Sequence, residues 1–284
     1  MSRTIDPDVE LGLGLGWRPE LAWLIERHRG LGFVEVIAEG LDPEGPLPAA
    51  MERLRERGVR VVPHGISLSI GGAGPLDRSR LAALATLATR LEAPVVSEHV
   101  AFVRAGGVEA GHLLPVPRSP KMLDLLVDRV RRVQDALPVP LALENVSTLV
   151  EWPEPVMGEA EFLAELLDRT GALLLLDVAN IYANARNHGG DAIAFLDALP
   201  LDRIAYVHLG GGVDREGFYH DTHAHPVPAP VFGLLEELSA RGPVPGALLE
   251  RDDRFPTDDA ILAELDAIRD ALDRGRSRGP VDGR

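Results

Sequence analysis

Histidine and acidic side chains recur in this chain at the points where short apolar runs stop. His64 lies in a Pro-His-Gly-Ile-Ser segment, His99 directly follows Glu98, and Asp221 and His223 share a loop after a later run. One such residue is a weak signal, but the recurrence at nearly every run from the third onward indicates a shared site. The candidate metal ligands are His64, His99, Glu144, Asp177, His208, Asp221, His223 and Glu250.

Side chains that converge in this way need cations. Four of the eight candidates are carboxylates, and carboxylates brought together repel one another and take up protons unless divalent metals neutralise them. Catalytic sites use about three protein ligands per metal and keep one position open, so this set predicts two or three metal ions. Imidazole and carboxylate donors without sulfur favour iron, manganese or zinc. Composition alone does not choose among these metals.

Other reactive arrangements are poorer. The chain has no G-x-S-x-G segment for a serine nucleophile and no G-x-x-x-x-G-K-[ST] phosphate-binding loop. Of the remaining histidines, His188 in the segment Asn-His-Gly-Gly is a candidate for contact with substrate or metal. We expect His28 to be exposed on the first helix and assign it no ligand role.

The elements that must position these residues alternate along the chain. Eight short runs rich in Val, Ile and Leu are each followed by an amphipathic stretch, as in buried parallel strands joined by helices. Eight such units predict an α/β fold, a closed (β/α)8 TIM barrel, in which functional groups lie at the carboxyl ends of the strands. The runs are 11–17, 33–39, 60–67, 94–102, 140–147, 172–180, 203–211 and 246–252.

A doubly wound open sheet is the alternative to the barrel. Gly12, Gly14 and Gly16 do not complete the dinucleotide-binding pattern G-x-G-x-x-G, because Trp17 and Arg18 follow. We interpret them as part of a first strand that lets its neighbours approach closely. A single domain is expected over residues 1–275, with a disordered tail over residues 276–284 that is rich in Gly and Arg.

The bulk properties exclude several classes of protein. A formal net charge of −15 argues against surfaces for nucleic acid or anionic membranes, which need clustered positive charge. The absence of cysteine excludes disulfides, thiolate zinc sites and iron–sulfur clusters. The polar, acidic start does not resemble a signal peptide, and the apolar runs are too short to span a bilayer. We therefore expect a cytoplasmic protein.

The candidate ligands lie in short motifs that together are similar to one family. The motifs are HGISLSIG from His64, SEHVAF from Ser97, LEN from Leu143, LDVANIY from Leu176, HL from His208, DTH from Asp221, and Glu250. In this order, over about Leu11 to Phe255, they resemble the multinuclear non-heme iron-dependent oxidases related to the methanobactin-biosynthesis oxidase. The resemblance implies a xylose-isomerase-like TIM barrel in which the eight candidates bind two or three iron ions.

The same resemblance implies O2-dependent modification of a ribosomally synthesised precursor peptide, often at cysteine, together with a partner protein that binds the leader peptide. It also implies that Asn180, and Asn145 beside Glu144, ligate a metal or orient a ligand. One position departs from the family pattern: Ala179 stands where relatives commonly have Asn. The occupancy of a third metal position is therefore left open.

Two other functions stay open at this stage. The first is a non-redox divalent-metal enzyme of the sugar isomerase or phosphoesterase type, because paired metals in a barrel mouth serve proton transfer and water activation equally well. The second is a binding module in which the metals are structural and a partner performs the chemistry. The iron-dependent peptide oxidase is ranked ahead of both.

Overall fold

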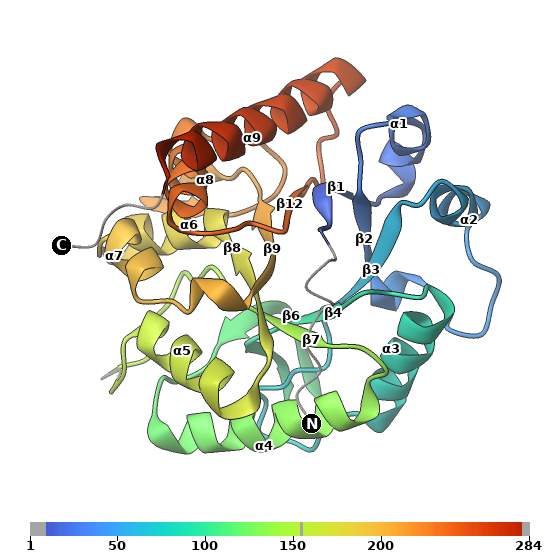
Figure 1. Cartoon of the computed structure of the whole chain (residues 1–284). Helices are drawn as coiled ribbons and strands as arrows, with labels where there is room; N and C mark the ends of the chain where they lie inside the picture. The colour runs from blue at the N-terminus through green and yellow to red at the C-terminus, as the bar shows by residue number, and fades with distance from the viewer. Residues whose placement is uncertain (1–9, 154–155, 280–284) are drawn as a thin grey trace.

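Eight short parallel strands close into a barrel in the computed structural model, which describes residues 10–153 and 156–279 (Figure 1). β1 pairs with β2 on one side and with β12 on the other, and this closure excludes the open-sheet alternative. The predicted (β/α)8 barrel is therefore confirmed. In the order in which they pair, the strands are β1 (Gly12–Gly16), β12 (Gly246–Leu249), β9 (Ile204–Leu209), β8 (Leu173–Asp177), β7 (Leu141–Glu144), β4 (Val96–His99), β3 (Arg60–Gly65) and β2 (Phe33–Ile37).

Helices surround the barrel, as Figure 1 shows. Their inner faces are apolar at a spacing of three and four residues; in α4, for example, Leu123, Leu126, Val130 and Val133 are buried. Three short 3₁₀ helices, η1 (Pro19–Leu21), η2 (Ala38–Gly40) and η3 (Leu201–Arg203), accompany them in the described ranges. The α-helices are α1 (Ala22–Arg27), α2 (Ala49–Glu56), α3 (Arg78–Arg90), α4 (Pro120–Ala136), α5 (Glu159–Thr170), α6 (Val178–His188), α7 (Ala192–Asp197), α8 (Ala229–Arg241) and α9 (Asp258–Arg278).

Several boundaries differ from those expected. The run 172–180 was predicted as one strand, but the chain turns into α6 directly after Asp177, so Asn180 lies in the first helical turn. α6 was not predicted, and His188 is its last residue. α9 continues through Arg278, so residues 276–278 of the expected tail are helical. The rest of that prediction, residues 280–284, lies outside the described residues.

Two β-hairpins project from the carboxyl ends of the barrel strands. β5 (Ala101–Ala105) and β6 (Val108–Pro115) follow β4, and β10 (Val213–Arg215) and β11 (Phe218–His220) follow β9. Neither hairpin was predicted from the sequence. The run 94–102 was interpreted as a single strand, and β10 and β11 lie beyond the predicted run 203–211. Both hairpins lie at the mouth of the barrel, the end that carries functional groups in this fold.

The core has two parts. Apolar side chains between strands and helices form the larger cluster, and a smaller cluster that includes Phe33, Val62, Leu175 and Leu248 fills the barrel interior. A Cβ on Gly14 would lie 2.3 Å from the ring of Phe33. The expected close approach at the first strand is therefore made by this aromatic ring. None of the helices in the described ranges is long and apolar enough to cross a membrane.

Candidate metal centre

The period of two along the strands places the candidate ligands in one layer. Inward-facing positions alternate with outward-facing ones, and two residues beyond the apolar interior residues Val62 and Leu175 stand His64 and Asp177. The parallel register aligns His99 with Glu144 and Asp177 with His208. A polar layer therefore lies directly above the apolar floor of the barrel. Its buried members include His64, His99, Glu144, Asp177, His208 and Glu250.

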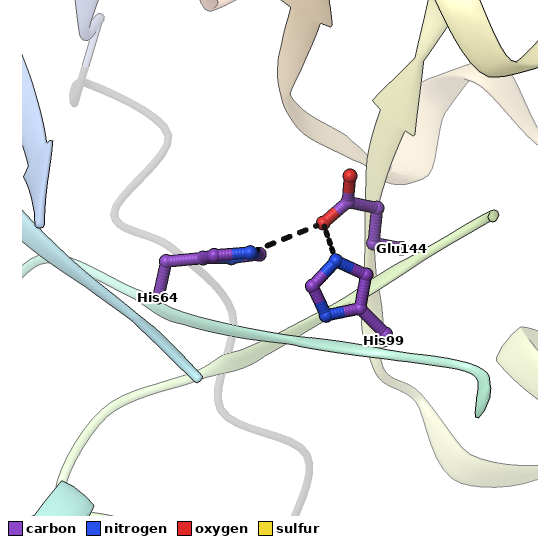
Figure 2. Close-up of side chains that lie close together, drawn as sticks. All are labelled: His64, His99 and Glu144. Atoms are coloured by element: carbon purple, nitrogen blue, oxygen red, sulfur yellow. Dashed lines mark ion pairs between the residues drawn. The ribbon is translucent and has the colours of Figure 1, made fainter. Parts of the chain in front are cut away.

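The first group of ligands is formed by β3, β4 and β7. Figure 2 shows the imidazoles of His64 and His99 directed at one carboxylate oxygen of Glu144. His64 Nε2 lies 3.6 Å and His99 Nε2 lies 3.2 Å from Glu144 Oε2. One ligand atom from each residue lies within 4.8 Å of the other two. This spacing suits a single cation bound by all three side chains.

The second group uses the other oxygen of the same carboxylate. His208 Nδ1 lies 3.3 Å from Glu144 Oε1 and 3.2 Å from Glu250 Oε2. Glu144, Asp177 and His208 also present three ligand atoms within 4.8 Å of one another. Glu144 can thus bridge two cations, one through each carboxylate oxygen.

A third group lies toward the β9 side of the mouth. Asp177, His223 and Glu250 form another set within 4.8 Å, and His223 Nδ1 lies 3.4 Å from Glu250 Oε2. Asp221 is absent from these sets among the described residues, but its Oδ2 lies 2.8 Å from His223 Nε2. His223 adopts a left-handed φ of 50°, and its carbonyl accepts a hydrogen bond from Asp252 N.

The electrostatics of the cluster call for positive charge. Burial raises the pKa of Asp177, and the neighbouring Asp221 and Glu144 carboxylates raise it further, well above the ordinary value. Burial would also raise the pKa of Glu144, but His99 and His208 together lower it to about 2. A bound cation would offset this repulsion between the buried carboxylates.

Polar atoms without hydrogen-bond partners also indicate that the cluster is suited to a cation. Buried polar groups normally have hydrogen-bond partners, yet several ligand atoms of this layer have none within the described residues. The donors are imidazole nitrogens and carboxylate or amide oxygens, which suit a divalent metal. The unpartnered atoms of the cluster are His99 Nδ1, Glu144 Oε2, Asp177 Oδ2, Asn180 Oδ1, His208 Nδ1 and Asp221 Oδ1.

The two predicted asparagines sit beside the centre in different ways. Asn145 Nδ2 donates to the carbonyl of Asp177 at 3.0 Å, and Asn145 Oδ1 accepts from Asp177 N at 2.9 Å. Asn180 Nδ2 donates to Asn145 O at 2.9 Å, which leaves its own Oδ1 without a partner in the described chain. Ala179 is fully buried and packs in the core between strands and helices. Asn145 therefore holds the backbone of a ligand, while Asn180 offers a free oxygen.

His188 lies apart from the ligand groups. Its Nε2 is 2.7 Å from Thr148 O and 2.8 Å from Thr148 Oγ1, so it anchors the loop after β7. Glu35, by contrast, was missed by sequence reasoning, which assigned the end of the second strand to Glu39. Glu35 is buried inside the barrel and forms a ligand-spaced set with His208 and Glu250. Its position two residues after the interior Phe33 is the signal that could have identified it.

The closed barrel and its buried His/Glu/Asp layer define the class: a TIM barrel with a metal-capable mouth. Residues 12–273 match the family model described as the RiPP precursor modification enzyme MbnB/TglH/ChrH, where RiPP denotes a ribosomally synthesised and post-translationally modified peptide. The chain belongs to this enzyme family, and its members modify peptide precursors. The family resemblance seen in the sequence motifs is thereby confirmed.

Two relatives match nearly the whole of this chain. A UPF0276 protein of Streptomyces avermitilis is 52% identical over 275 residues, which cover 94% of this chain and 56% of the relative. This chain thus spans a little over half the length of that relative. A UPF0276 protein of Caulobacter vibrioides is 40% identical over 269 residues, covering 93% of this chain and 95% of the relative.

Solved structures share the fold. An L-ribulose 3-epimerase superposes with a TM-score of 0.63 at 16% identity, covering 94% of this chain and 96% of the epimerase. Endonuclease IV of Thermus thermophilus gives a TM-score of 0.60 at 22% identity, covering 92% of this chain and 99% of the endonuclease. A putative xylose isomerase of Rhodospirillum rubrum has a TM-score of 0.56 at 15% identity and coverage of 93% and 98%. These likenesses confirm the xylose-isomerase-like barrel.

Proposed function

We propose that this chain is an iron-dependent oxidase that uses O2 to modify a ribosomally synthesised precursor peptide, with cysteine as the modified residue. The family membership supports the peptide substrate. One observation carries the metal part of the proposal: one oxygen of Glu144 faces the imidazoles of His64 and His99, and the other faces the imidazole of His208. A carboxylate bridge between neighbouring cations is suited to multinuclear chemistry.

The described residues fit two or three iron ions. His64, His99 and Glu144 would hold one ion, and Glu144, Asp177 and His208 would hold a second. When bound, iron supplies the redox chemistry with O2, and a neighbouring ion lowers the pKa of a substrate thiol. The residues proposed for a third ion are Asp177, Asp221, His223 and Glu250, with Asn180 Oδ1 beside them.

The protein's own contribution is placement and exclusion of water. The imidazoles and carboxylates are buried and fixed by strand register, so they hold the cations in a set geometry. Asn145 holds the backbone of Asp177, and the apolar floor below the layer closes the barrel to water from the other end. A precursor peptide therefore reaches the centre from the mouth.

Loops around the mouth offer apolar contact to such a peptide. Large apolar side chains are exposed there on the loop after β7 and on both hairpins, and an exposed apolar patch is one mark of a binding surface. Trp152 Nε1 donates to Pro115 O at 2.7 Å, which ties the β7 loop to β6. We place the precursor and a leader-binding partner protein, both in the cytoplasm, on this side. The exposed residues are Val108, Leu149, Val150, Trp152, Val156 and Phe218.

The test is metal analysis combined with turnover. Protein purified without oxygen is analysed for metals, examined by Mössbauer spectroscopy after 57Fe loading, and assayed with a cysteine-containing precursor encoded beside the gene. We expect two or three irons per chain and O2-dependent product. A colourless, metal-free protein that still converts the peptide would contradict the proposal. Full activity with zinc in the absence of O2 would instead favour a non-redox metalloenzyme.

A further inference from the structure

A chain of buried hydrogen bonds lies beneath the metal layer. Tyr206 OH lies 2.6 Å from Glu35 Oε2 and 2.7 Å from Ser97 Oγ, and Ser97 Oγ lies 2.8 Å from His64 Nδ1. At the other end, His208 Nε2 lies 2.9 Å from the same oxygen of Glu35. β2, β3, β4 and β9 thus contribute to one continuous network, and all five of its residues are buried.

The direction of each hydrogen bond in this chain follows from its acidic end. Glu35 Oε2 is a carboxylate oxygen that accepts hydrogen bonds, here one from the phenol of Tyr206 and one from the Nε2–H of His208. The phenol has a single hydrogen, so the hydroxyl of Ser97 must donate to the phenol oxygen. Ser97 Oγ is then left to accept from the Nδ1–H of His64.

Both histidines are thereby fixed in one tautomer each. His64 carries its proton on Nδ1 and offers Nε2, which faces Glu144 Oε2 at 3.6 Å. His208 carries its proton on Nε2 and offers Nδ1, which lies 3.2 Å from Glu250 Oε2 and has no hydrogen-bond partner among the described residues. In each ring the free nitrogen is the one directed at the proposed metal positions. The two rings use opposite nitrogens.

Glu35 is better placed to orient than to ligate. His208 directs its Nδ1 at Glu144 Oε1 and Glu250 Oε2, which leaves its other ring nitrogen, Nε2, to face Glu35 Oε2 at 2.9 Å. Glu35 Oε2 already receives Tyr206 OH. Partners of this kind fix the ring orientation and raise the basicity of metal-bound histidines.

We propose that Glu35 is a positioning residue that sets the tautomer of His208 directly and that of His64 through Tyr206 and Ser97. The inference rests on the proposed metal centre. It predicts an asymmetry between variants: Glu35→Met removes the acceptor and affects both histidines. Tyr206→Phe cuts the chain between Ser97 and Glu35, so it frees His64 and leaves His208 in place. Glu35→Gln keeps an acceptor oxygen and retains both tautomers.

The experiment reads tautomers and affinity without using turnover. Protein labelled with 15N-histidine is studied by long-range 1H–15N NMR, metal-free and loaded with diamagnetic Zn²⁺, and Zn²⁺ affinity is measured by competition with a chelator. We expect Nδ1–H on His64 and Nε2–H on His208 in the Zn²⁺-loaded wild type. Zn²⁺ affinity should fall about 10–100-fold in Glu35→Met. Glu165→Gln on α5 and Tyr182→Phe on α6 are the matched controls, and circular dichroism checks the fold.

The possible outcomes distinguish failure of the positioning role of Glu35 from failure of the metal centre. Unchanged tautomers and unchanged affinity in Glu35→Met would overturn the positioning role. So would loss of a whole ion in Glu35→Met with an undisturbed His64 in Tyr206→Phe, because that pattern identifies Glu35 as a ligand. A wild-type chain that binds no Zn²⁺ but keeps the Nδ1–H of His64 and the Nε2–H of His208 when metal-free would contradict the metal centre and support the network.

Discussion

At the scale of single residues, Glu144 is the point on which the centre depends. Its Oε2 faces His64 and His99, and its Oε1 faces His208, so one side chain serves two groups of ligands. The histidines differ from Glu144 in this respect. His64 and His99 face only its Oε2, and His208 faces only its Oε1. Substitutions at these positions should therefore differ in how many ions they remove.

We expect Glu144→Gln to lower the metal content by more than one ion per chain, because the amide replaces a charged bridge by a neutral group whose nitrogen cannot ligate. His99→Ala should remove only the ion shared with His64. Metal-to-protein ratios from elemental analysis after anaerobic loading with Fe²⁺ provide the measurement. The exposed Glu165→Gln serves as the matched control, and equal losses in Glu144→Gln and His99→Ala would contradict the bridging role.

At the scale of elements, strand ends are tied to one another by side chains as well as by register. Asn145, directly after β7, makes two hydrogen bonds to the backbone of Asp177 at the end of β8. α6 begins at that point, with Asp177 Oδ1 accepting from Asn180 N. The layer of ligands is thus built from short links between neighbouring strands.

Asn145→Ala should destabilise the protein by about 2–6 kcal/mol, because it leaves two buried backbone groups of Asp177 without partners, at about 1–3 kcal/mol each. Urea unfolding of the metal-free protein gives this free energy directly. A loss below about 0.5 kcal/mol in Asn145→Ala would show that the link is dispensable, since a net hydrogen bond contributes at least that much.

The loop after β7 gives a second prediction at this scale. Its backbone is held by α6, through Asn184 Oδ1 accepting from Thr148 N and through His188, while Trp152 remains 44% exposed. Trp152→Ala should raise the KM for the precursor peptide and leave metal content unchanged, since the ring lies outside the ligand layer. Trp23→Ala on α1 is the control for loss of an exposed tryptophan. An unchanged KM in Trp152→Ala would remove this loop from the proposed peptide surface.

At the scale of the whole molecule, the alternation of apolar runs and amphipathic stretches was enough to predict the barrel. What it could not predict were the features built on the strand ends. The apolar run through Leu176 continues into Val178 and Ala179 with only Asp177 between them, so the change from strand to helix leaves no composition signal there. The β5–β6 hairpin follows β4 after a single residue, Val100, and was absorbed into one run for the same reason.

The site was predicted from the residues at the ends of the apolar runs, and the prediction was incomplete because it considered only those strand ends. Strand ends are visible in sequence, so seven of the eight predicted ligands fall in ligand-spaced sets, while Asp221 contacts one of them. Glu35 lies inside a strand, where only the inward and outward alternation identifies it. Hydrogen-bond chains such as the one from Glu35 to His64 join four strands and depend on barrel closure, which no local pattern contains.

The dependence of the whole fold on its cations gives the last prediction. The proposed ligands come from six of the eight barrel strands or their ends, so bound ions link most of the barrel and bind the folded state alone. A ligand at 100 times its Kd stabilises by about 2.7 kcal/mol per site, which for a domain of this size corresponds to a Tm increase of roughly 5–10 °C for each ion. Chelation should therefore lower the Tm by at least that amount, measured by calorimetry with and without Fe²⁺ under anaerobic conditions. In Glu144→Gln the difference in Tm with and without Fe²⁺ should largely disappear, because the bridge that couples the ions is gone. A wild-type Tm that does not respond to chelation would mean that the cluster does not hold metal in the folded protein.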